Sequence, residues 1–149
     1  MSQILPAEPH HVFITGGSRG IGAAAVRAFA AKGYDVAFTW HTRADAAEAV
    51  LRQARELYPQ GQFLAIRADA ADPAEARAAV KQAEDAFGRL EVLVCNAGIA
   101  QQKLFTDLTD DDWRAMMAND LDSVFYACRA VLPGMIRRKY GRLLCVSSM

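Results

Sequence analysis

Short runs of β-branched and aromatic residues alternate along this chain with longer, alanine-rich runs, and this alternation limits the folds that it can adopt. The short runs predict strands at residues 11–15, 35–40, 62–68, 91–95 and 142–146. The long runs predict helices at residues 20–32, 44–58, 73–87 and 110–139. Because a helical run separates each strand from the next, we expect a parallel sheet with right-handed crossovers. The apolar run at residues 12–14 lacks polar alternation, which indicates a sheet covered on both faces.

Helical spacing and helix-end residues add finer expectations. In the first helix, the side chains expected to be buried are Ile21, Ala25, Ala28 and Phe29. In the second helix they are Ala47, Val50, Leu51, Ala54 and Leu57. Gly33 is expected to end the first helix in a left-handed conformation, and Asp72 and Pro73 to cap and open the third. The long helix is expected to break near Asn119 and to be strained at Pro133.

The composition is typical of one globular domain, which we expect to span residues 1–149. Hydrophobic residues make up 52% of the 149 residues, enough for a packed core. Lys and Arg number 17, as do Asp and Glu, so the net charge is zero. A chain with no net charge has no excess of positive charge to attract nucleic acid or anionic lipid. No apolar run is long enough to span a membrane. We therefore expect neither a nucleic-acid nor a membrane partner.

The cysteines and the first residues indicate the cellular compartment of the protein. Cys95, Cys128 and Cys145 lie in apolar surroundings without the spacing of metal ligands. They are expected to be reduced core thiols of a cytoplasmic protein, with no metal site. Residues 1–11 contain no basic segment, so a secretory signal is not expected.

A glycine-rich turn joins the first strand directly to the first helix. Glycines let a backbone approach a pyrophosphate closely, and a helix N-terminus favours its negative charge. The alternative is an ordinary glycine-rich turn, but the strand–turn–helix context favours a dinucleotide site. The residues expected to bind the cofactor here are Gly16, Ser18, Arg19, Gly20, Ile21 and Gly22. With the alternating pattern, this turn predicts a Rossmann-type, doubly wound parallel sheet.

The turn at residues 15–22 reads Thr-Gly-x-x-x-Gly-Ile-Gly, which resembles the short-chain dehydrogenase/reductase family. Further elements match the family in order from about residue 12 to residue 149, and the resemblance implies that the sheet is truncated after the fifth strand. Asn96, Ala97 and Gly98 resemble its Asn-Ala-Gly element, although Cys95 replaces the preceding Asn. That element implies that Asn96 joins the central strands and that Gly98 leaves room for the cofactor.

The resemblance implies roles for residues in three further places. Asp69, followed by Ala70, matches the family's contact to the adenine, although a solvated loop carboxylate is the alternative. Asn119 matches an Asn that kinks the helix and holds a water for proton relay, with a surface Asn as the alternative. Ser148 matches the catalytic serine, whose hydroxyl binds the substrate carbonyl oxygen, and Ser147 is the second choice.

The end of the second strand indicates the cofactor preference. Rossmann sites that prefer NAD place an acidic residue there, and this chain has no carboxylate before Asp45. Arg19 and Arg43 are two cations suited to a 2′-phosphate. We expect NADP(H) in preference to NAD(H), and NAD(H) is the second choice. The alternative for the arginines is that one or both are solvated and do not reach the site.

The family's Tyr-x-x-x-Lys pair, which supplies the general acid or base, is absent from these residues. Tyr140 precedes the fifth strand, and Leu144 lies four positions after it. We therefore expect an oxidoreductase seen as its N-terminal portion, with little or no activity in these 149 residues alone. The resemblance implies a small carbonyl or alcohol substrate and a homo-oligomer paired through residues 119–139. A catalytically silent dinucleotide-binding protein and a non-functional fragment are the alternatives.

Overall fold

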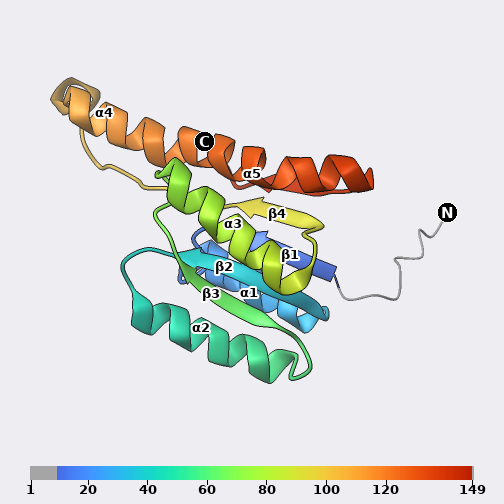
Figure 1. The fold of residues 1–149 in the computed structure, drawn as a ribbon. Helices are drawn as coiled ribbons and strands as arrows, with labels where there is room; N and C mark the ends of the chain where they lie inside the picture. Colours follow the sequence, from blue (N-terminus) through green and yellow to red (C-terminus); the bar gives the residue numbers. More distant parts are fainter. Residues whose placement is uncertain (1–9, 149) are drawn as a thin grey trace.

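The computed structural model describes residues 10–148, and strands alternate with helices as predicted (Figure 1). The expected domain, residues 1–149, includes residues 1–9 and 149, which lie outside the described residues, and most of the segment considered for a secretory signal lies there too. The strands are β1 (His10–Ile14), β2 (Tyr34–Trp40), β3 (Phe63–Arg67), β4 (Val92–Cys95) and β5 (Arg142–Cys145). The α-helices are α1 (Gly20–Ala31), α2 (Ala44–Leu57), α3 (Pro73–Phe87), α4 (Asp110–Met117) and α5 (Ser123–Arg138). Two short helices, η1 (Phe105–Asp107) and η2 (Ala118–Asp122), flank α4.

All the strands form one parallel sheet in the order β3-β2-β1-β4-β5. Helices α1 and α2 cover one face of it, and α3 and α5 cover the other (Figure 1). The chain runs outward from β1 to β3 and then crosses back to β4, so the strand order reverses between β1 and β4. The predicted Rossmann-type, doubly wound parallel sheet is confirmed, and its switch point lies where such sheets bind their ligands.

Strand β1 shows why the apolar runs lack polar alternation. Val12 and Ile14 pack in the core beneath α1 and α2, whereas Phe13 packs in the core beneath α3 and α5. All three are at most 1% exposed. A central strand covered on both faces needs apolar side chains at every position, and the sequence supplies them.

The predicted buried face is nearly right for α2 and wrong for α1. In α2 the expected residues are buried except Leu57. In α1 the buried residues are Gly22, Ala23, Val26 and Ala30, and Ile21 is 65% exposed. Ala25 and Phe29 are only partly buried at the edge of the core. The close packing of Gly22 against the preceding turn determines how α1 is rotated, and periodicity alone does not reveal that contact.

The predicted helix ends are confirmed. Gly33 follows α1 with φ of +79°, the left-handed conformation that glycine adopts easily. The carboxylate of Asp72 accepts hydrogen bonds from the N–H groups of Ala74 and Glu75 at 2.8 and 2.9 Å, and Pro73 opens α3. The cap at Asp72 fixes where α3 begins, just after the loop that follows β3 at the carboxyl edge of the sheet.

The long helix is interrupted near Asn119, as expected. Its segment η2 is a π-helix between α4 and α5. The Asn119 side chain donates a hydrogen bond to the Ala115 carbonyl at 2.9 Å, which suits a wider turn. Pro133 does not break α5, and the helix runs through it. Among residues 10–148, no helix is both long and apolar enough to cross a membrane.

Strand β5 lies at the edge of the sheet and pairs with β4. All of its residues are exposed, including Leu143 and Leu144. An apolar strand edge with unpaired backbone groups is a template for pairing with another chain.

We therefore predict that the 149-residue chain self-associates through β5 and that Leu144→Lys lowers this association. A charge on the edge strand opposes pairing between copies. Light scattering across a concentration series measures the effect. The matched control is Leu57→Lys, because Leu57 is a similarly exposed leucine on α2. A wild-type chain that stays monomeric at high concentration, or equal effects of the two variants, would contradict the prediction.

Candidate functional site

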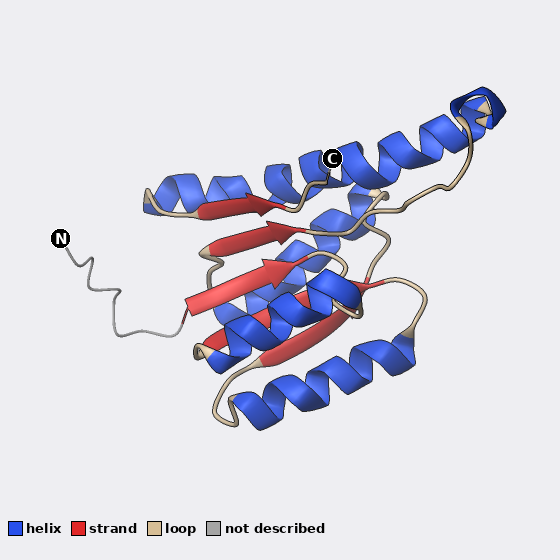
Figure 2. Cartoon of the chain, turned by 180° about the vertical axis from the view of Figure 1, so that it is seen from behind, coloured by secondary structure: helices blue, strands red, loops and turns tan. Residues whose placement is uncertain are grey.

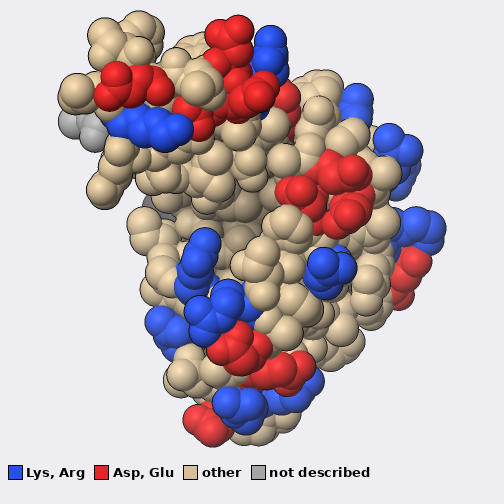
Figure 3. All heavy atoms as spheres, turned by 90° about the vertical axis from the view of Figure 1, so that its left-hand side faces the viewer, with Lys and Arg blue, Asp and Glu red and all other residues tan. Residues whose placement is uncertain are grey.

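A cavity of about 380 Å³ opens at the carboxyl edge of the sheet, next to the switch point between β1 and β4. Figure 2 shows the strand arrows all directed toward this edge. Its lining comes from the loops that follow β1, β2, β3 and β4, and from η2. Figure 3 views the molecule from this side and shows Lys and Arg side chains gathered along the lower border of a hollow.

The glycine-rich turn is folded tightly against β2 and β4. Gly16 has φ of +69°, and its N–H donates to the Thr39 hydroxyl at 3.0 Å. The N–H of Gly17 donates to the Thr39 carbonyl at 2.8 Å. A Cβ on Gly22 would lie only 2.0 Å from the Gly16 carbonyl oxygen. The turn and α1 therefore pack together at a distance that only glycine allows.

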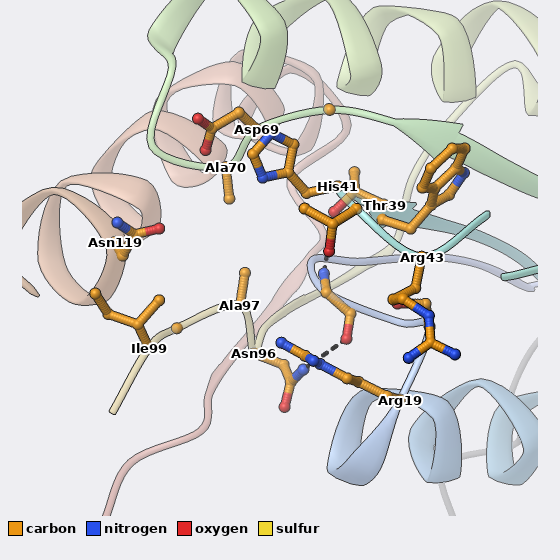
Figure 4. A pocket seen from close by; sticks show the side chains of 16 residues that line it. Arg19, Thr39, His41, Arg43, Asp69, Ala70, Asn96, Ala97, Ile99 and Asn119 are labelled. Carbon is orange, nitrogen blue, oxygen red and sulfur yellow. Dashed lines mark hydrogen bonds between the residues drawn. The ribbon is translucent and has the colours of Figure 1, made fainter. Parts of the chain in front are cut away.

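Thr15 and Asn96 join the ends of β1 and β4. The Thr15 hydroxyl accepts hydrogen bonds from the N–H groups of Asn96 and Ala97, both at 3.0 Å. In return, the Asn96 amide donates to the carbonyls of Thr15 at 3.2 Å and Gly16 at 3.0 Å. Both strand ends are thus held in one network that shapes the base of the cavity, and Figure 4 shows the part of it that joins Asn96 to the glycine-rich turn.

Helix α1 begins at this network without the usual capping groups. No side chain caps its N-terminus, and its first turn contains no acidic residue. Asp72 caps α3, and Thr109 with Asp112 caps α4. The uncapped backbone N–H groups of α1 and the positive end of its dipole suit an anionic ligand such as a pyrophosphate.

Asp120 fastens the loop after β4 to η2. Its carboxylate accepts a hydrogen bond from the Ile99 N–H at 2.8 Å. A Cβ on Gly98 would lie 2.8 Å from the same carboxylate oxygen, so glycine permits this close approach. Asn119 lines the cavity beside it, and the Asn119 carbonyl accepts a hydrogen bond from the Ser123 hydroxyl at 2.6 Å.

The predicted charged residues also line the cavity. Arg19 and Arg43 lie across the view from Asn119 in Figure 4. Asp69 also lines the cavity, and its carboxylate accepts a hydrogen bond from the Ala71 N–H at 2.9 Å. Arg43 forms an ion pair with Asp45, 2.7 Å between Nη2 and Oδ2.

The structure brings most of the predicted site residues to this cavity. The predicted residues that line it are Gly16, Ser18, Arg19, Arg43, Asp69, Ala70, Asn96, Ala97, Gly98 and Asn119. Those that do not line it are Gly20, Ile21, Gly22 and Ser148. The three turn residues lie at the start of α1, where Gly22 packs inward and Ile21 points outward. Ser148 follows β5 at the same edge of the sheet and is exposed.

Sequence reasoning missed three residues that organise the site, namely Thr15, Thr39 and Asp120. Their side chains bond to backbone groups that lie 21 to 82 positions away in the chain. Local sequence patterns carry no signal for such bonds. Each threonine lies at the end of a strand near the switch point, which could have drawn attention to them. Thr15 also opens the Thr-Gly-x-x-x-Gly-Ile-Gly motif on which the family resemblance rests.

The cysteines differ in burial. Cys95 is buried and Cys128 is partly buried, but Cys145 is exposed, so the expectation of core thiols is wrong for Cys145. Its strand β5 is the exposed edge of the sheet. Burial raises the pKa of the Cys95 and Cys128 thiols, which disfavours their reactive thiolate forms. Within residues 10–148, no cluster of His, Cys, Asp or Glu is arranged to hold a metal ion.

We predict that Thr15→Val destabilises the fold by about 1–3 kcal/mol, because it leaves two backbone N–H groups without their acceptor. Valine preserves the shape of the buried side chain. Urea denaturation followed by circular dichroism measures the change in the free energy of unfolding. Thr106→Val, at an exposed threonine, is the matched control and should have almost no effect. Equal stability of the two variants would show that the Thr15 hydroxyl is dispensable.

Comparisons with known proteins agree with this geometry. The family model described as short chain dehydrogenase matches residues 10–149. A 3-oxoacyl-[acyl-carrier-protein] reductase of Synechocystis sp. is 35% identical over 136 residues, which are 91% of this chain and 54% of that protein. The oxidoreductase UcpA of Escherichia coli is 36% identical over 137 residues, which are 91% of this chain and 50% of that protein.

Solved structures show the same likeness. A short-chain dehydrogenase/reductase from Serratia marcescens superposes with a TM-score of 0.88 at 40% identity, over 97% of this chain and 57% of that one. The chain spans about half the length of the curated relatives that it matches. With the family model matching nearly its whole length, the chain belongs to the short-chain dehydrogenase/reductase family of oxidoreductases.

Proposed function

We propose that this chain binds NADP(H) and serves an oxidoreductase that transfers hydride between the nicotinamide and a small carbonyl or alcohol compound. The observation that carries the proposal is the uncapped N-terminus of α1, which begins beside a cavity lined by Arg19 and Arg43. An anionic dinucleotide would satisfy both the free N–H groups and the two cations. Residues 1–149 would form the cofactor-binding domain of such an enzyme.

The lining residues fit the parts of a dinucleotide. The turn at Gly16, Ser18 and Gly20, with the following Ile21 and Gly22 at the start of α1, would hold the pyrophosphate. Asp69 and Ala70 lie beyond β3, where the adenine would bind. Asn96, Ala97 and Gly98, which line the cavity after β4, would face the ribose and nicotinamide. When bound, the nicotinamide supplies or accepts the hydride.

We propose NADP(H) in preference to NAD(H) because no acidic residue occupies the end of β2. The loop that begins there instead reads His-Thr-Arg at residues 41–43. The two arginines would bind the 2′-phosphate, for which a planar guanidinium is well suited. Bound NAD(H) would leave them without that partner.

Two further residues are proposed to act on the reacting groups. The Ser148 hydroxyl would donate a hydrogen bond to the carbonyl oxygen and stabilise the charge that develops there. Asn119 would support proton relay from the π-helical segment. No Tyr-x-x-x-Lys sequence occurs among the 149 residues, so the general acid of the family is missing from them. These residues alone would therefore bind the cofactor but turn over poorly.

We also propose a cellular location and an oligomeric contact for the chain. A cytoplasmic location suits its thiols, and pairing of copies through α5 suits the exposed Phe125 and Ile136 on that helix. A membrane or nucleic-acid partner is not proposed, because the net charge is zero.

Isothermal titration of the chain with NADP⁺ and NAD⁺ tests the binding proposal. We predict tighter binding of NADP⁺, and a loss of about tenfold or more in NADP⁺ affinity for Arg19→Ala and for Arg43→Ala. The affinity for NAD⁺ should change much less in both variants. Arg52→Ala removes an exposed arginine of α2 away from the cavity and is the matched control. If neither dinucleotide binds, the proposal fails.

Loss of NADPH absorbance in the presence of carbonyl compounds tests the catalytic proposal. We predict that residues 1–149 alone show little or no turnover above background, because the Tyr-x-x-x-Lys pair that would supply the proton to the carbonyl oxygen is absent from them. Turnover that disappears in Ser148→Ala would instead show a complete catalytic site. Binding without turnover would agree equally with a dinucleotide-binding protein that has no catalytic role, and a longer chain carrying the Tyr-x-x-x-Lys pair would separate the two.

A further inference from the structure

Arg43 and Arg19 are not equivalent in this structure. The Arg43 guanidinium donates hydrogen bonds to both carboxylate oxygens of Asp45, at 2.9 Å from Nε to Oδ1 and 2.7 Å from Nη2 to Oδ2. Across the described residues, the Arg19 side chain has no such acidic partner. Arg19 therefore offers its whole guanidinium to the cavity, whereas Arg43 offers only the part that Asp45 leaves uncovered.

The pairing of Arg43 with Asp45 follows from local geometry. Arg43 is the residue before α2, and Asp45 lies in the first turn of that helix. The two side chains are 59% and 69% exposed, so they meet in water beside the cavity rather than in the core. An exposed pair of this kind is held weakly and can be opened by a competing anion.

A 2′-phosphate at Arg43 would meet this carboxylate directly. The phosphate and the carboxylate are both anions, and both seek the two-pronged contact that a guanidinium offers. If Asp45 stays, it keeps one edge of the guanidinium from the phosphate. If Asp45 leaves, the free energy of the Arg43–Asp45 pair is lost.

We infer that Asp45 is a specificity-determining residue, whose carboxylate competes with the cofactor's 2′-phosphate for the Arg43 guanidinium. This inference rests on the proposed binding of NADP(H). It means that the preference for NADP(H) over NAD(H) is smaller than Arg19 and Arg43 alone would give.

The competition persists across the working pH range. The hydrogen bonds from Arg43 lower the pKa of Asp45 to about 2, and the same pair raises the pKa of Arg43. A carboxyl group with a depressed pKa stays ionised at every pH well above that value. Neutral or mildly acidic buffers therefore leave the pair charged, and a substitution is needed to release Arg43.

The test compares Asp45→Asn with Glu48→Gln. Both variants remove one negative charge from an exposed position on α2, but only Asp45 contacts Arg43. The titrated ligands are NADP⁺, NAD⁺ and the smaller pair adenosine 2′,5′-bisphosphate and adenosine 5′-monophosphate, which isolates the 2′-phosphate. Thermal unfolding followed by circular dichroism checks that both variants fold.

For Asp45→Asn we expect NADP⁺ and the bisphosphate to bind roughly threefold to tenfold more tightly, with little change for NAD⁺ and the monophosphate. Glu48→Gln should change each affinity by less than about twofold. In an Arg43→Ala background, Asp45→Asn should lose most of its effect, because the competition acts through Arg43.

Three results would overturn the inference. Equal effects of Asp45→Asn and Glu48→Gln would show that only the overall charge matters. If Asp45→Asn tightened NADP⁺ binding just as much in the Arg43→Ala background, the Asp45 carboxylate would repel the phosphate directly rather than compete for Arg43. Weaker NADP⁺ binding by Asp45→Asn would show that Asp45 orients Arg43 for the phosphate. These outcomes leave the proposed function standing, whereas failure of the wild-type chain to bind either dinucleotide would overturn both.

Discussion

The hydroxyl of Thr15 accepts hydrogen bonds from two consecutive N–H groups at the end of β4, and the site depends on this contact. It brings the loops after β1 and β4 together at the point where the strand order reverses. Asn96 can then reach the turn, and Gly22 can pack against the Gly16 carbonyl. The start of α1 and the cavity floor lie at this junction, whereas Asp120 anchors the loop at Gly98 to η2.

The sequence predicted the fold and most of the cavity lining because both follow from local patterns. Strand and helix periods set the order of elements, and parallel strands bring the loops at their carboxyl ends to one edge. Gly16, Asp69 and Asn96 each follow a strand, so their convergence required no knowledge of side-chain contacts. The cap at Asp72 and the left-handed Gly33 were equally local and were confirmed.

What the sequence could not predict depends on contacts between distant residues. The rotation of α1 is determined by Gly22 against the turn, so the expected position of Ile21 in the core was wrong. The hydroxyls of Thr15 and Thr39 and the carboxylate of Asp120 bond to backbone groups far away in the chain. The exposure of Cys145 follows from the place of β5 in the sheet, which strand order rather than composition determines.

The π-helix at η2 has a consequence for how this part of the chain tolerates insertion and deletion. A short π-helical segment amounts to an α-helix with one added residue. Deleting one residue there would restore a regular α-helix, and α4 and α5 would stay aligned because the wider turn spreads nearly the same rotation over one more residue. The side chains inside η2 would instead change direction, so Asp120 would turn away from the Ile99 N–H and the loop after β4 would lose its anchor. The length of this segment, and not only its side chains, is therefore a property on which the cavity depends.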